Sequence, residues 1–324
     1  MDSNKTKKAL VTGSSGLVGS WFVKKLLKEN FEVTGISLDN TKNYLLDSLE
    51  IIKDFETHYI NIENFEKLEK ILNKEKFDIV YHFAAQTQVR DAINDPITTF
   101  NSNIKGTWNL LELCRQLDIP IVVASSDKAY GIAETLPYKE DFRLNGVFPY
   151  EVSKSITDML VNTYKISYGL TVCTLRCGNI YGGGDLNWDR LIPGVIKWLL
   201  NNEQPILRTD CSFKRDWVYV QDVVEAYYLV GNKLLSNEDI STAYNFAGVD
   251  YLSVLEVYKS LCRVINGDYV EPKYLIDSEL EIPDQYLDSS KIENELGFKS
   301  RFSLDESIGE TVNWYKKNLD KLTI

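Results

Sequence analysis

The sequence predicts an α/β protein: a doubly wound parallel sheet followed by a smaller C-terminal domain. Three observations predict this class. Strand-like and helix-like segments alternate through the first half of the chain, a glycine-rich turn joins the first strand to the first helix, and the alternation loosens after about residue 177. Such βαβα alternation places parallel strands in one sheet and helices on both of its faces.

The first half supplies short apolar strands and longer periodic helices. Residues 17–30 carry apolar side chains at 17, 18, 21, 22, 26 and 27, which is the period of a helix. Asn64 is expected to begin a polar helix as its N-cap. The predicted strands are 8–12, 32–36, 57–62, 78–83, 121–124 and 171–176, and the predicted helices are 17–30, 64–73, 96–117 and 150–168.

The second half is less regular. Three glycines at 182–184 mark a loop, residues 193–201 read as a helix, and 221–235 form a strongly amphipathic helix. The tail from about residue 250 mixes short helices and loops. We therefore predict a larger domain over 1–176, to which part of about 217–248 returns. A smaller domain over 177–324 is expected to lie across the carboxyl edge of the sheet.

Composition excludes several classes of protein. The chain has 324 residues, 44% of them hydrophobic, so one or two domains with a large core are expected. The net charge of −11 argues against a nucleic-acid or anionic-membrane partner. No signal peptide and no run of about 18 apolar residues is visible, so no membrane span is expected. Five cysteines without a C-x-x-C pair indicate reduced thiols in a cytoplasmic protein, and two histidines argue against a metal site.

The run VTGSSGLVG follows the first strand and opens the first helix, with glycines spaced G-x-x-G-x-x-G. Glycines let the backbone turn tightly and approach a pyrophosphate, and the helix N-terminus offers N–H groups and a partial positive charge. A purely structural glycine turn is the alternative, but the strand-to-helix placement favours a dinucleotide cofactor. The candidate contacts in this turn are Gly13, Ser15, Gly16, Leu17, Val18 and Gly19.

The end of the second predicted strand bears on the choice between NAD and NADP. An acidic residue there would bind the adenosine ribose and favour NAD. Ser37 occupies that position and Asp39 lies two residues later, and either side chain can bond a ribose hydroxyl. No arginine stands there to bind a 2′-phosphate, although Lys42 is near. The segment therefore favours NAD, with Ser37 as a candidate contact.

Two groups of residues indicate acid/base chemistry. Ser126, Asp127 and Lys128 follow the strand predicted at 121–124, and Tyr150 and Lys154 lie four apart on the next helix, which places them on one face. An ammonium and an oxidised nicotinamide both favour the phenolate of Tyr150, which can then act as a base on a sugar hydroxyl. Ser126 can bond the same oxygen. A surface helix pair is the alternative for Tyr150 and Lys154, and the glycine turn argues against it.

These segments together resemble the extended short-chain dehydrogenases/reductases that act on nucleotide sugars, over nearly the whole chain. The resemblance is strongest to the CDP-glucose 4,6-dehydratase branch, which carries Asp-Lys where Asp127 and Lys128 stand. Other 4,6-dehydratases carry Asp-Glu or a lone Glu there, and epimerases carry small or neutral residues. The matching motifs are VTGSSGLVGSW, HFAAQTQVRDAINDP, NSNIKGTWNLLE, SSDKAYG, PYEVSK, RCGNIYGGGD, DRLIP, RDWVYVQDVVEA and LDSSKIENELGF.

The resemblance implies a Rossmann fold, tightly bound NAD and the conversion of CDP-glucose to CDP-4-keto-6-deoxyglucose, as in deoxysugar synthesis for cell-surface polysaccharides. Ser126, Tyr150 and Lys154 would form the triad that oxidises C4, and Lys154 would also bind the nicotinamide ribose. A base would remove the C5 hydrogen while Asp127 helps the 6-hydroxyl leave as water. Lys128 would be that base, or a charge that stabilises the enolate, or a solvated loop lysine.

The resemblance also assigns contacts around the substrate. Arg215 is the candidate for a phosphate clamp, because a guanidinium fork fits phosphate oxygens. Arg190 is expected nearer the base or ribose, and a surface ion pair is the alternative for both arginines. The expected substrate contacts are Gln86, Arg90, Ser126, Asn179, Arg190 and Arg215.

The remaining contacts concern the cofactor and the core. Arg90 would reach the sugar or a phosphate, or would pair with Asp91 or Asp95 as a structural residue. His82 is expected as a buried core histidine. The further cofactor contacts are Asn61, Ile62, Ala84, Ala85, Gln86, Asn103, Tyr150 and Lys154.

Several alternatives stay open. A 4-epimerase or reductase of the same fold would share Tyr150 and Lys154, and Asp127 with Lys128 argues against it. A GDP-, dTDP- or UDP-hexose would fit the same motifs as CDP-glucose. A non-catalytic NAD-binding scaffold is disfavoured by the intact acid/base residues. The resemblance further implies a homodimer through helices 97–117 and 150–168, whose faces could otherwise pack internally.

Overall fold

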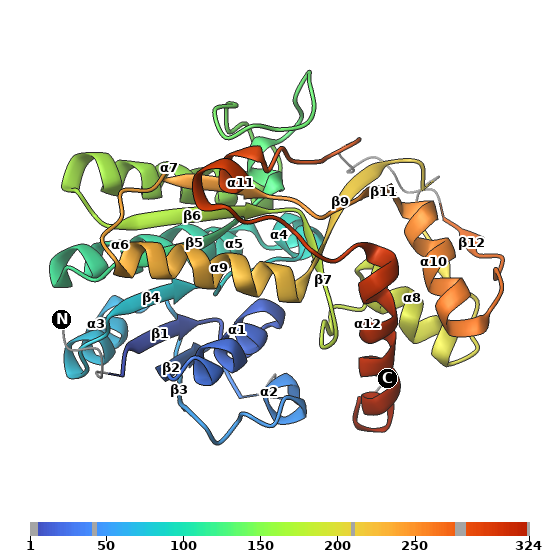
Figure 1. Cartoon of the computed structure of the whole chain (residues 1–324), viewed down its shortest axis with the longest axis horizontal. Coiled ribbons are helices and arrows are strands. Elements are labelled where there is room, and N and C mark those ends of the chain that lie inside the picture. Colours follow the sequence, from blue (N-terminus) through green and yellow to red (C-terminus); the bar gives the residue numbers. More distant parts are fainter. Residues whose placement is uncertain (1–5, 41–43, 209–210, 276–282, 323–324) are drawn as a thin grey trace.

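The computed structural model describes residues 6–40, 44–208, 211–275 and 283–322, and its centre is a parallel sheet (Figure 1). Within these residues the sheet has seven strands in the order β10-β6-β5-β4-β1-β2-β3. The order runs outward from β1 in both directions, which is the doubly wound arrangement and confirms the predicted fold class. The strands are β1 (Lys8–Thr12), β2 (Glu32–Ser37), β3 (Glu56–Tyr59), β4 (Ile79–His82), β5 (Ile121–Ser126), β6 (Val172–Cys177) and β10 (Ala243–Phe246).

Helices cover both faces of this sheet (Figure 1). Along β1, Ala9 and Val11 pack into one core and Leu10 packs into the other, because successive strand residues point to opposite faces. The first core includes side chains of α1 (Leu17–Lys28) and α9 (Val220–Leu235). The second includes those of α3 (Phe65–Lys74), α6 (Gly106–Leu117) and α7 (Pro149–Tyr168).

The structure differs from the predicted elements in a few places. The helix expected over 96–117 is divided into α5 (Pro96–Phe100), a π-helical segment η1 (Asn101–Lys105) and α6. A π-helical turn inside a helix is often found at functional sites, and this one carries Asn103. The strand expected over 57–62 ends at Tyr59, and the strand expected to end at 124 continues to Ser126. Asn64 caps α3 as expected, since its side chain accepts the N–H of Lys67 at 3.0 Å.

The second half of the chain adds elements to the large sheet and its helices and also builds the smaller sheets. α9 packs against α1, and β10 extends the large sheet beside β6. Most of the remaining elements build smaller sheets and helices to one side, whereas the helix α11 (Ser290–Leu296) lies over the large sheet and contacts β10 (Figure 1). These are β7 (Asn179–Tyr181), β8 (Ile206–Leu207), β9 (Lys214–Tyr219), β11 (Tyr251–Ser253), β12 (Lys273–Tyr274), α8 (Leu191–Leu200), α10 (Val254–Asn266), α11 (Ser290–Leu296), α12 (Leu304–Asn318) and η3 (Leu319–Lys321). The domain boundaries at 176 and 177 stay predictions.

The parallel strands end at one edge, and that edge gathers the candidate site. β1 ends at Thr12 before the glycine turn, β4 ends at His82 before Ala84, and β5 ends at Ser126. Ligands of doubly wound sheets bind outside the carboxyl ends of the strands. Short helices complete this edge of the described chain: α2 (Tyr44–Ser48), α4 (Val89–Asn94) and the 3₁₀ turn η2 (Asp127–Tyr130).

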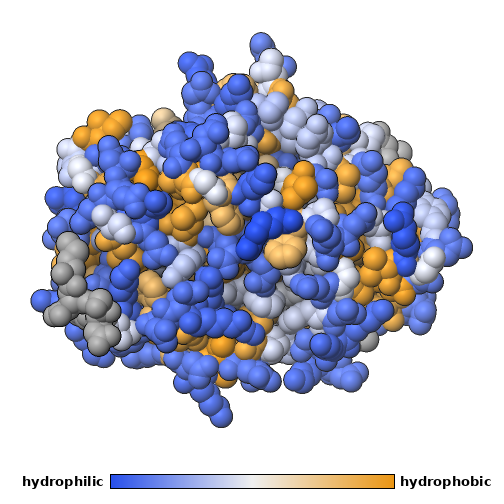
Figure 2. Space-filling model, in the orientation of Figure 1, coloured by the Kyte–Doolittle hydropathy of each residue, from blue (hydrophilic) through white to orange (hydrophobic). Residues whose placement is uncertain are grey.

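The surface carries both hydrophilic and hydrophobic side chains. Figure 2 shows a face on which hydrophilic side chains predominate and hydrophobic ones form separate patches. Among the helices of the described ranges, none combines the length and the apolar character that a membrane span requires.

Candidate active site

The turn between β1 and α1 requires glycine. Gly13 has a φ of 71°, and a Cβ there would lie 2.7 Å from the backbone nitrogen of Ala84. A Cβ on Gly19 would lie 2.0 Å from the carbonyl oxygen of Gly13. α1 begins after Gly16, which has no side chain to accept an N–H of the first turn, and the first turn carries no acidic residue. The turn thus combines close backbone approach with a helix N-terminus, which is the arrangement that binds a pyrophosphate.

The neighbouring residues of the predicted dinucleotide site differ in exposure. Ser37 is buried, with its Oγ 3.0 Å from Ser14 Oγ, whereas Asp39 is exposed. Asn61 is exposed and its Oδ1 accepts the N–H of Glu63 at 2.9 Å. Ile62 packs in the core. Contacts of these residues with a cofactor stay predictions, and Lys42 lies outside the described residues.

A buried hydrogen-bond chain supports the end of β4. His82 lies between two threonines, with Nδ1 2.7 Å from Thr12 Oγ1 and Nε2 2.9 Å from Thr107 Oγ1. Thr107 Oγ1 donates to the Asn103 carbonyl at 2.6 Å, so it accepts the proton of Nε2, and Nδ1 accepts from Thr12. Burial lowers the pKa of His82 to about 3, which keeps the ring neutral. The prediction of a buried core histidine is confirmed.

Asn103 holds the loop after β4 in place. Its Oδ1 accepts the backbone N–H of Gln86 at 2.7 Å, and its Nδ2 donates to the Gln86 carbonyl and to Ser153 Oγ, each at 2.9 Å. The amide therefore ties β4 to α7. The Gln86 side chain donates through Nε2 to the Gln88 carbonyl, and its buried Oε1 has no partner among the described residues. A buried acceptor of this kind favours a ligand that donates to it.

Hydrogen bonds fix the start of α7 to the segment before it and to η2. Glu151 Oε2 accepts the backbone N–H groups of Val147 at 2.9 Å and Phe148 at 3.2 Å. Ser155 Oγ accepts the N–H of Gly146 and donates to the carbonyl of Ala129 in η2 at 2.7 Å. These bonds fix α7, which carries Tyr150 and Lys154, relative to η2, which carries Asp127 and Lys128.

Burial dominates the electrostatics of Tyr150 and Lys154. It raises the pKa of Tyr150 to about 12, and the charge of Asp127 adds to this, whereas a hydrogen bond with Ser126 lowers it. Burial lowers the pKa of Lys154 to about 8, and its Nζ donates to the Ala124 carbonyl at 2.9 Å. Burial therefore opposes the phenolate form of Tyr150 that the sequence leads us to expect.

Ser126, Asp127 and Lys128 form a contiguous hydrogen-bonded group. Ser126 Oγ donates to Asp127 Oδ1 at 2.9 Å, and Lys128 Nζ donates to Asp127 Oδ2 at 3.1 Å. The side chain of Lys128 is 18% exposed and that of Asp127 is 2% exposed, so the alternative of a solvated loop lysine is wrong. Burial is the largest influence on Lys128 and lowers its pKa. A carboxyl group and a lysine with a lowered pKa thus lie side by side at the end of β5.

Gln285 is the site residue that sequence reasoning missed. Its buried side chain accepts a hydrogen bond from Lys128 Nζ, across a separation of 157 residues. Asp216, also missed, is a buried carboxyl that accepts the N–H of Leu287 at 2.6 Å, and burial raises its pKa well above the usual value. No spacing rule connects residues so far apart, and only the fold brings them together.

Three of the predicted substrate residues lie on or beside the three-stranded sheet β11-β9-β7, called the smaller sheet below. Arg215 is buried on β9, where its guanidinium donates to the carbonyls of Lys214 at 2.9 Å and Pro283 at 2.6 Å. Asn179 on β7 pairs with Trp217, two residues further along β9. Arg190 donates to Asp185 Oδ2 and to the Ile180 carbonyl, each at 2.6 Å, so the ion pair that was the alternative for this residue is present. The positive charge of Arg190 also lowers the pKa of Tyr150. A cavity of about 410 Å³ opens nearby, lined by Ile132, Ala133, Leu136, Tyr138, Ser212, Phe213, Pro283 and Asp284.

The other predicted residues lie at the rim. Arg90 is exposed on α4. Asp95, which one alternative pairs with Arg90, caps α5 by accepting the N–H of Thr98 at 3.0 Å. Ala84 and Ala85 are half-buried beside the glycine turn, as are Ser15, Leu17 and Val18 within it. Contacts of these residues with a ligand stay predictions.

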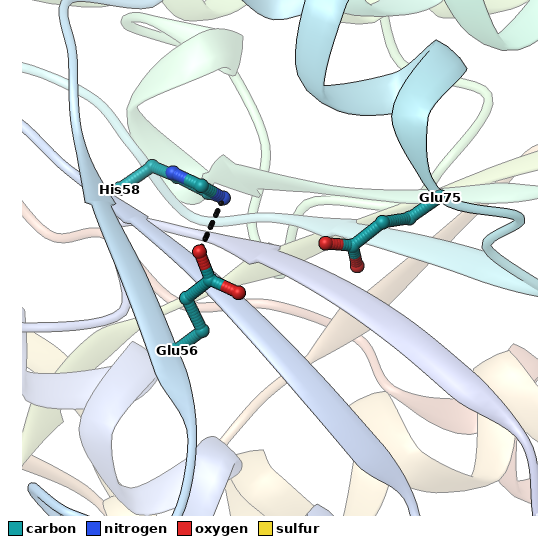
Figure 3. Close-up of side chains that lie close together, drawn as sticks. All are labelled: Glu56, His58 and Glu75. Atoms are coloured by element: carbon teal, nitrogen blue, oxygen red, sulfur yellow. Dashed lines mark ion pairs between the residues drawn. The ribbon is translucent and has the colours of Figure 1, made fainter.

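A separate cluster of metal-ligating side chains lies away from this edge. Glu56 and His58 come from β3 and Glu75 follows α3, and their ligand atoms lie within 4.8 Å of one another (Figure 3). His58 Nε2 is 3.4 Å from Glu56 Oε1, and Lys8 Nζ is 2.7 Å from Glu75 Oε2. Glu56 begins β3, so the cluster lies toward the amino ends of the strands and takes no part in the site.

Comparison with known proteins places these features in a family. The model of the GDP-mannose 4,6-dehydratase family matches residues 10–311. A CDP-glucose 4,6-dehydratase of Salmonella typhimurium is 32% identical over 96% of this chain and 90% of the relative. A putative UDP-glucose 4-epimerase of Methanocaldococcus jannaschii is 34% identical over 95% of this chain and 98% of the relative. A dTDP-glucose 4,6-dehydratase structure from Streptomyces venezuelae, with NAD bound, has a TM-score of 0.87 at 26% identity, covering 98% of this chain and 99% of that one.

The family match over residues 10–311 includes the glycine turn, the segment at the end of β5 and the strand that carries Arg215. The resemblance read from the sequence motifs is confirmed. The chain belongs to the GDP-mannose 4,6-dehydratase family of extended short-chain dehydrogenases/reductases, which act on nucleotide sugars.

Proposed function

We propose that this protein is an NAD-dependent nucleotide-sugar 4,6-dehydratase, with CDP-glucose as its substrate. One observation carries the proposal: the Lys128 amine and the Asp127 carboxyl are in contact, 3.1 Å apart, beside Ser126. Oxidation and reduction at C4 need only Tyr150 and Lys154. Elimination of water needs an additional acid and base, and this pair supplies them.

The chain's own groups fit NAD. The glycine turn would hold the pyrophosphate, Ser37 or Asp39 the adenosine ribose, and Lys154 the nicotinamide ribose. The unpartnered Oε1 of Gln86 would accept a hydrogen bond from the cofactor or the sugar. When bound, NAD would supply the hydride acceptor for C4 and the hydride donor for C6.

Tyr150 acts first. Its phenolate takes the proton of the 4-hydroxyl while the C4–H bond breaks, which creates the ketone. Burial raises the pKa of Tyr150 and an ionised Asp127 raises it further. The positive charge of a bound nicotinamide would offset the burial, and the protonated Asp127 that the elimination requires would carry no opposing charge. Ser126, hydrogen-bonded with Tyr150, orients the same oxygen.

Lys128 and Asp127 carry out the elimination. The 4-ketone acidifies the C5 hydrogen, and the Lys128 amine takes it as a proton. The electron pair of the C5–H bond forms the C5–C6 double bond as the C6–O bond breaks, and Asp127 gives its proton to the departing hydroxyl, which leaves as water. The burial that lowers the pKa of Lys128 favours the neutral amine that this step needs.

The proton balance closes inside the protein. Lys128 returns its proton to C5 when C6 is reduced, so after one cycle Tyr150 has gained a proton and Asp127 has lost one. Ser126 is hydrogen-bonded with Tyr150 and donates to Asp127 Oδ1 at 2.9 Å. The serine hydroxyl can therefore pass the proton from Tyr150 to Asp127.

The smaller sheet would bind the nucleotide. Arg215 is the proposed clamp for the diphosphate, with Asn179 beside it and Arg190 toward the base or ribose. The homodimer also remains a proposal. It is supported by large apolar side chains exposed on the two helices concerned, among them Trp108, Met159 and Ile166.

A 4-epimerase is the second candidate, because the Methanocaldococcus relative bears that description at 34% identity. An epimerase returns the hydride to C4 and needs no acid or base at C5 and C6. The contact between Asp127 and Lys128 has no use in that reaction.

Incubation of the protein and NAD with CDP-, GDP-, dTDP- and UDP-hexoses tests the proposal. We expect CDP-glucose to lose one water, detected by mass spectrometry, and the product to absorb strongly in alkali as a 4-keto-6-deoxy sugar. Interconversion of two hexoses at C4 without loss of water would instead identify an epimerase. Dehydration of a GDP-, dTDP- or UDP-hexose alone would change the substrate and keep the reaction.

The substitution Asp127→Asn removes the proposed acid of the elimination and retains the residues proposed for C4 oxidation. We expect product formation to fall by about 10²- to 10⁴-fold, the usual contribution of a general acid. Asp127 raises the pKa of Tyr150 when it is ionised, and an asparagine carries no charge, so the variant has the lower Tyr150 pKa wherever the wild-type carboxyl is charged. The pH profile of NAD reduction by substrate should therefore move to lower pH. The exposed Asp141→Asn is the matched control, and an unchanged yield of dehydrated product in Asp127→Asn would remove Asp127 from the mechanism.

A further inference from the structure

Gln285 lies between the catalytic segment and the strand of the phosphate clamp. Its side chain is 0% exposed, and its Oε1 accepts a hydrogen bond from Lys128 Nζ. Its Nε2 donates to the Tyr138 hydroxyl at 3.4 Å. Its backbone N–H donates to the Lys214 carbonyl at 3.0 Å, and it forms a parallel β-bridge with Arg215. β9 thus fixes Gln285, and Gln285 fixes the amine of Lys128.

The two acceptors around Lys128 determine where its lone pair points. A neutral amine has two N–H groups and one lone pair. Nζ donates to Asp127 Oδ2 at 3.1 Å and to Gln285 Oε1, so both N–H groups of the neutral amine are used. The lone pair is left in the remaining direction. The Lys128 side chain is 18% exposed, whereas both acceptors are buried, so we infer that the lone pair faces the open side, from which a substrate would approach.

The charges that face Lys128 come from three elements. Asp127 on η2 and Glu151 on α7 raise its pKa, whereas burial and Arg215 on β9 lower it, and burial is the largest cause. Asp216, also on β9, is a buried carboxyl that interacts with Lys128, and burial favours its neutral form. The balance between the ammonium and the amine is therefore sensitive to one more charge at this place.

We propose that Gln285 is a positioning residue of the dehydration: its amide aims the Lys128 lone pair at C5 of the hexose without adding a charge. The inference rests on the proposed function, because only an elimination needs a base at C5. A carboxylate at position 285 would accept the same N–H but would favour the ammonium, which has no lone pair. An apolar side chain would leave one N–H without its acceptor and let the amine rotate.

Gln285→Glu and Gln285→Leu test the two parts of this proposal. For each variant, NAD reduction on addition of CDP-glucose reports C4 oxidation, and deuterium uptake from solvent at C5 reports the action of Lys128. We expect C4 oxidation to stay near the wild-type rate in both. C5 exchange should fall by about tenfold to a hundredfold in Gln285→Leu, since small misplacement of a catalytic group has effects of that size.

The pH profile distinguishes positioning from a merely structural role. In Gln285→Glu the carboxylate raises the pKa of Lys128, so the acidic limb of C5 exchange should move up by about one unit or more. In Gln285→Leu the limb should not move up, because no charge is added. Gln204→Glu is the matched control, since Gln204 is exposed and its Nε2 donates to the Glu271 carbonyl.

Each outcome decides between the possibilities. If the wild-type protein dehydrates no nucleotide hexose, the proposed function fails. If it dehydrates CDP-glucose but neither variant alters C5 exchange, Gln285 has no role in the step. Equal losses of C4 oxidation and C5 exchange, with the pH limb in place, would show a structural role and overturn the inference. Retained C4 oxidation demonstrates that a variant is folded, and Gln285→Asn provides a milder change if one is not.

Discussion

Replacement of Lys128 with Met is expected to abolish formation of the 4-keto-6-deoxy product while substrate still reduces bound NAD in part. Lys128 is the base proposed for C5, whereas C4 oxidation depends on Tyr150 and Lys154. A methionine has a similar length, but its thioether is neither basic nor charged. Loss of a positioned base lowers a rate by about 10²- to 10⁴-fold, so reduced NAD should accumulate instead of turning over.

The measurement is the absorbance of reduced nicotinamide during one turnover, followed by mass spectrometry of the sugar. Lys299→Met is the matched control, because Lys299 is 73% exposed and pairs only loosely with Glu293 at 3.6 Å. Accumulated reduced NAD without loss of water from the sugar would support the assignment. Full product formation by Lys128→Met would exclude Lys128 as the base and as the stabilising charge.

Replacement of Arg215 with Ala is expected to raise the KM for the nucleotide sugar sharply and to leave NAD binding unchanged. A hydrogen bond to a charged group contributes about 1.5–3 kcal/mol, so the loss corresponds to about a tenfold to hundredfold weaker substrate. Arg215 lies on β9, away from the glycine turn, which explains why the two ligands should respond differently.

The substitution Arg215→Lys distinguishes the contribution of the positive charge from that of the bidentate guanidinium. Lysine retains the positive charge but cannot bind two phosphate oxygens in parallel, so its KM should fall between those of the wild type and Arg215→Ala. Arg208→Ala, which removes an exposed pair with Asp189, is the control. Titration calorimetry with the nucleoside diphosphate alone checks the same contact, and an unchanged affinity in Arg215→Ala would refute the clamp.

Local patterns predicted most of the large sheet. β1 was expected over 8–12 and spans Lys8–Thr12, because a short apolar run before a glycine turn has few alternatives. The helix predicted over 150–168 is α7, Pro149–Tyr168. The helix over 96–117 was not expected to contain a π-helical segment, since its periodicity is continuous. The π-helical segment carries Asn103, which is hydrogen-bonded to the loop after β4. The periodicity of apolar residues cannot predict such a contact.

The candidate site was predicted in part. Ser126, Asp127 and Lys128 are neighbours in the chain, so their common place at the end of β5 followed from the strand itself. The burial of Lys128 did not follow, because a lysine after a strand is usually exposed. The segment 283–287 covers it, and that segment is distant in the sequence.

By itself, the sequence determined the fold class, the glycine turn, the spacing of Tyr150 and Lys154 and the family, because each is read from local patterns and their order along the chain. Only the tertiary structure decided which way the pKa of Tyr150 moves and which residue holds Lys128. Both depend on how much water is excluded and on which distant segment excludes it. Spacing along the chain does not encode these quantities. In the folded protein, burial sets the direction in which the pKa of Tyr150 moves, and Gln285 accepts the hydrogen bond of Lys128.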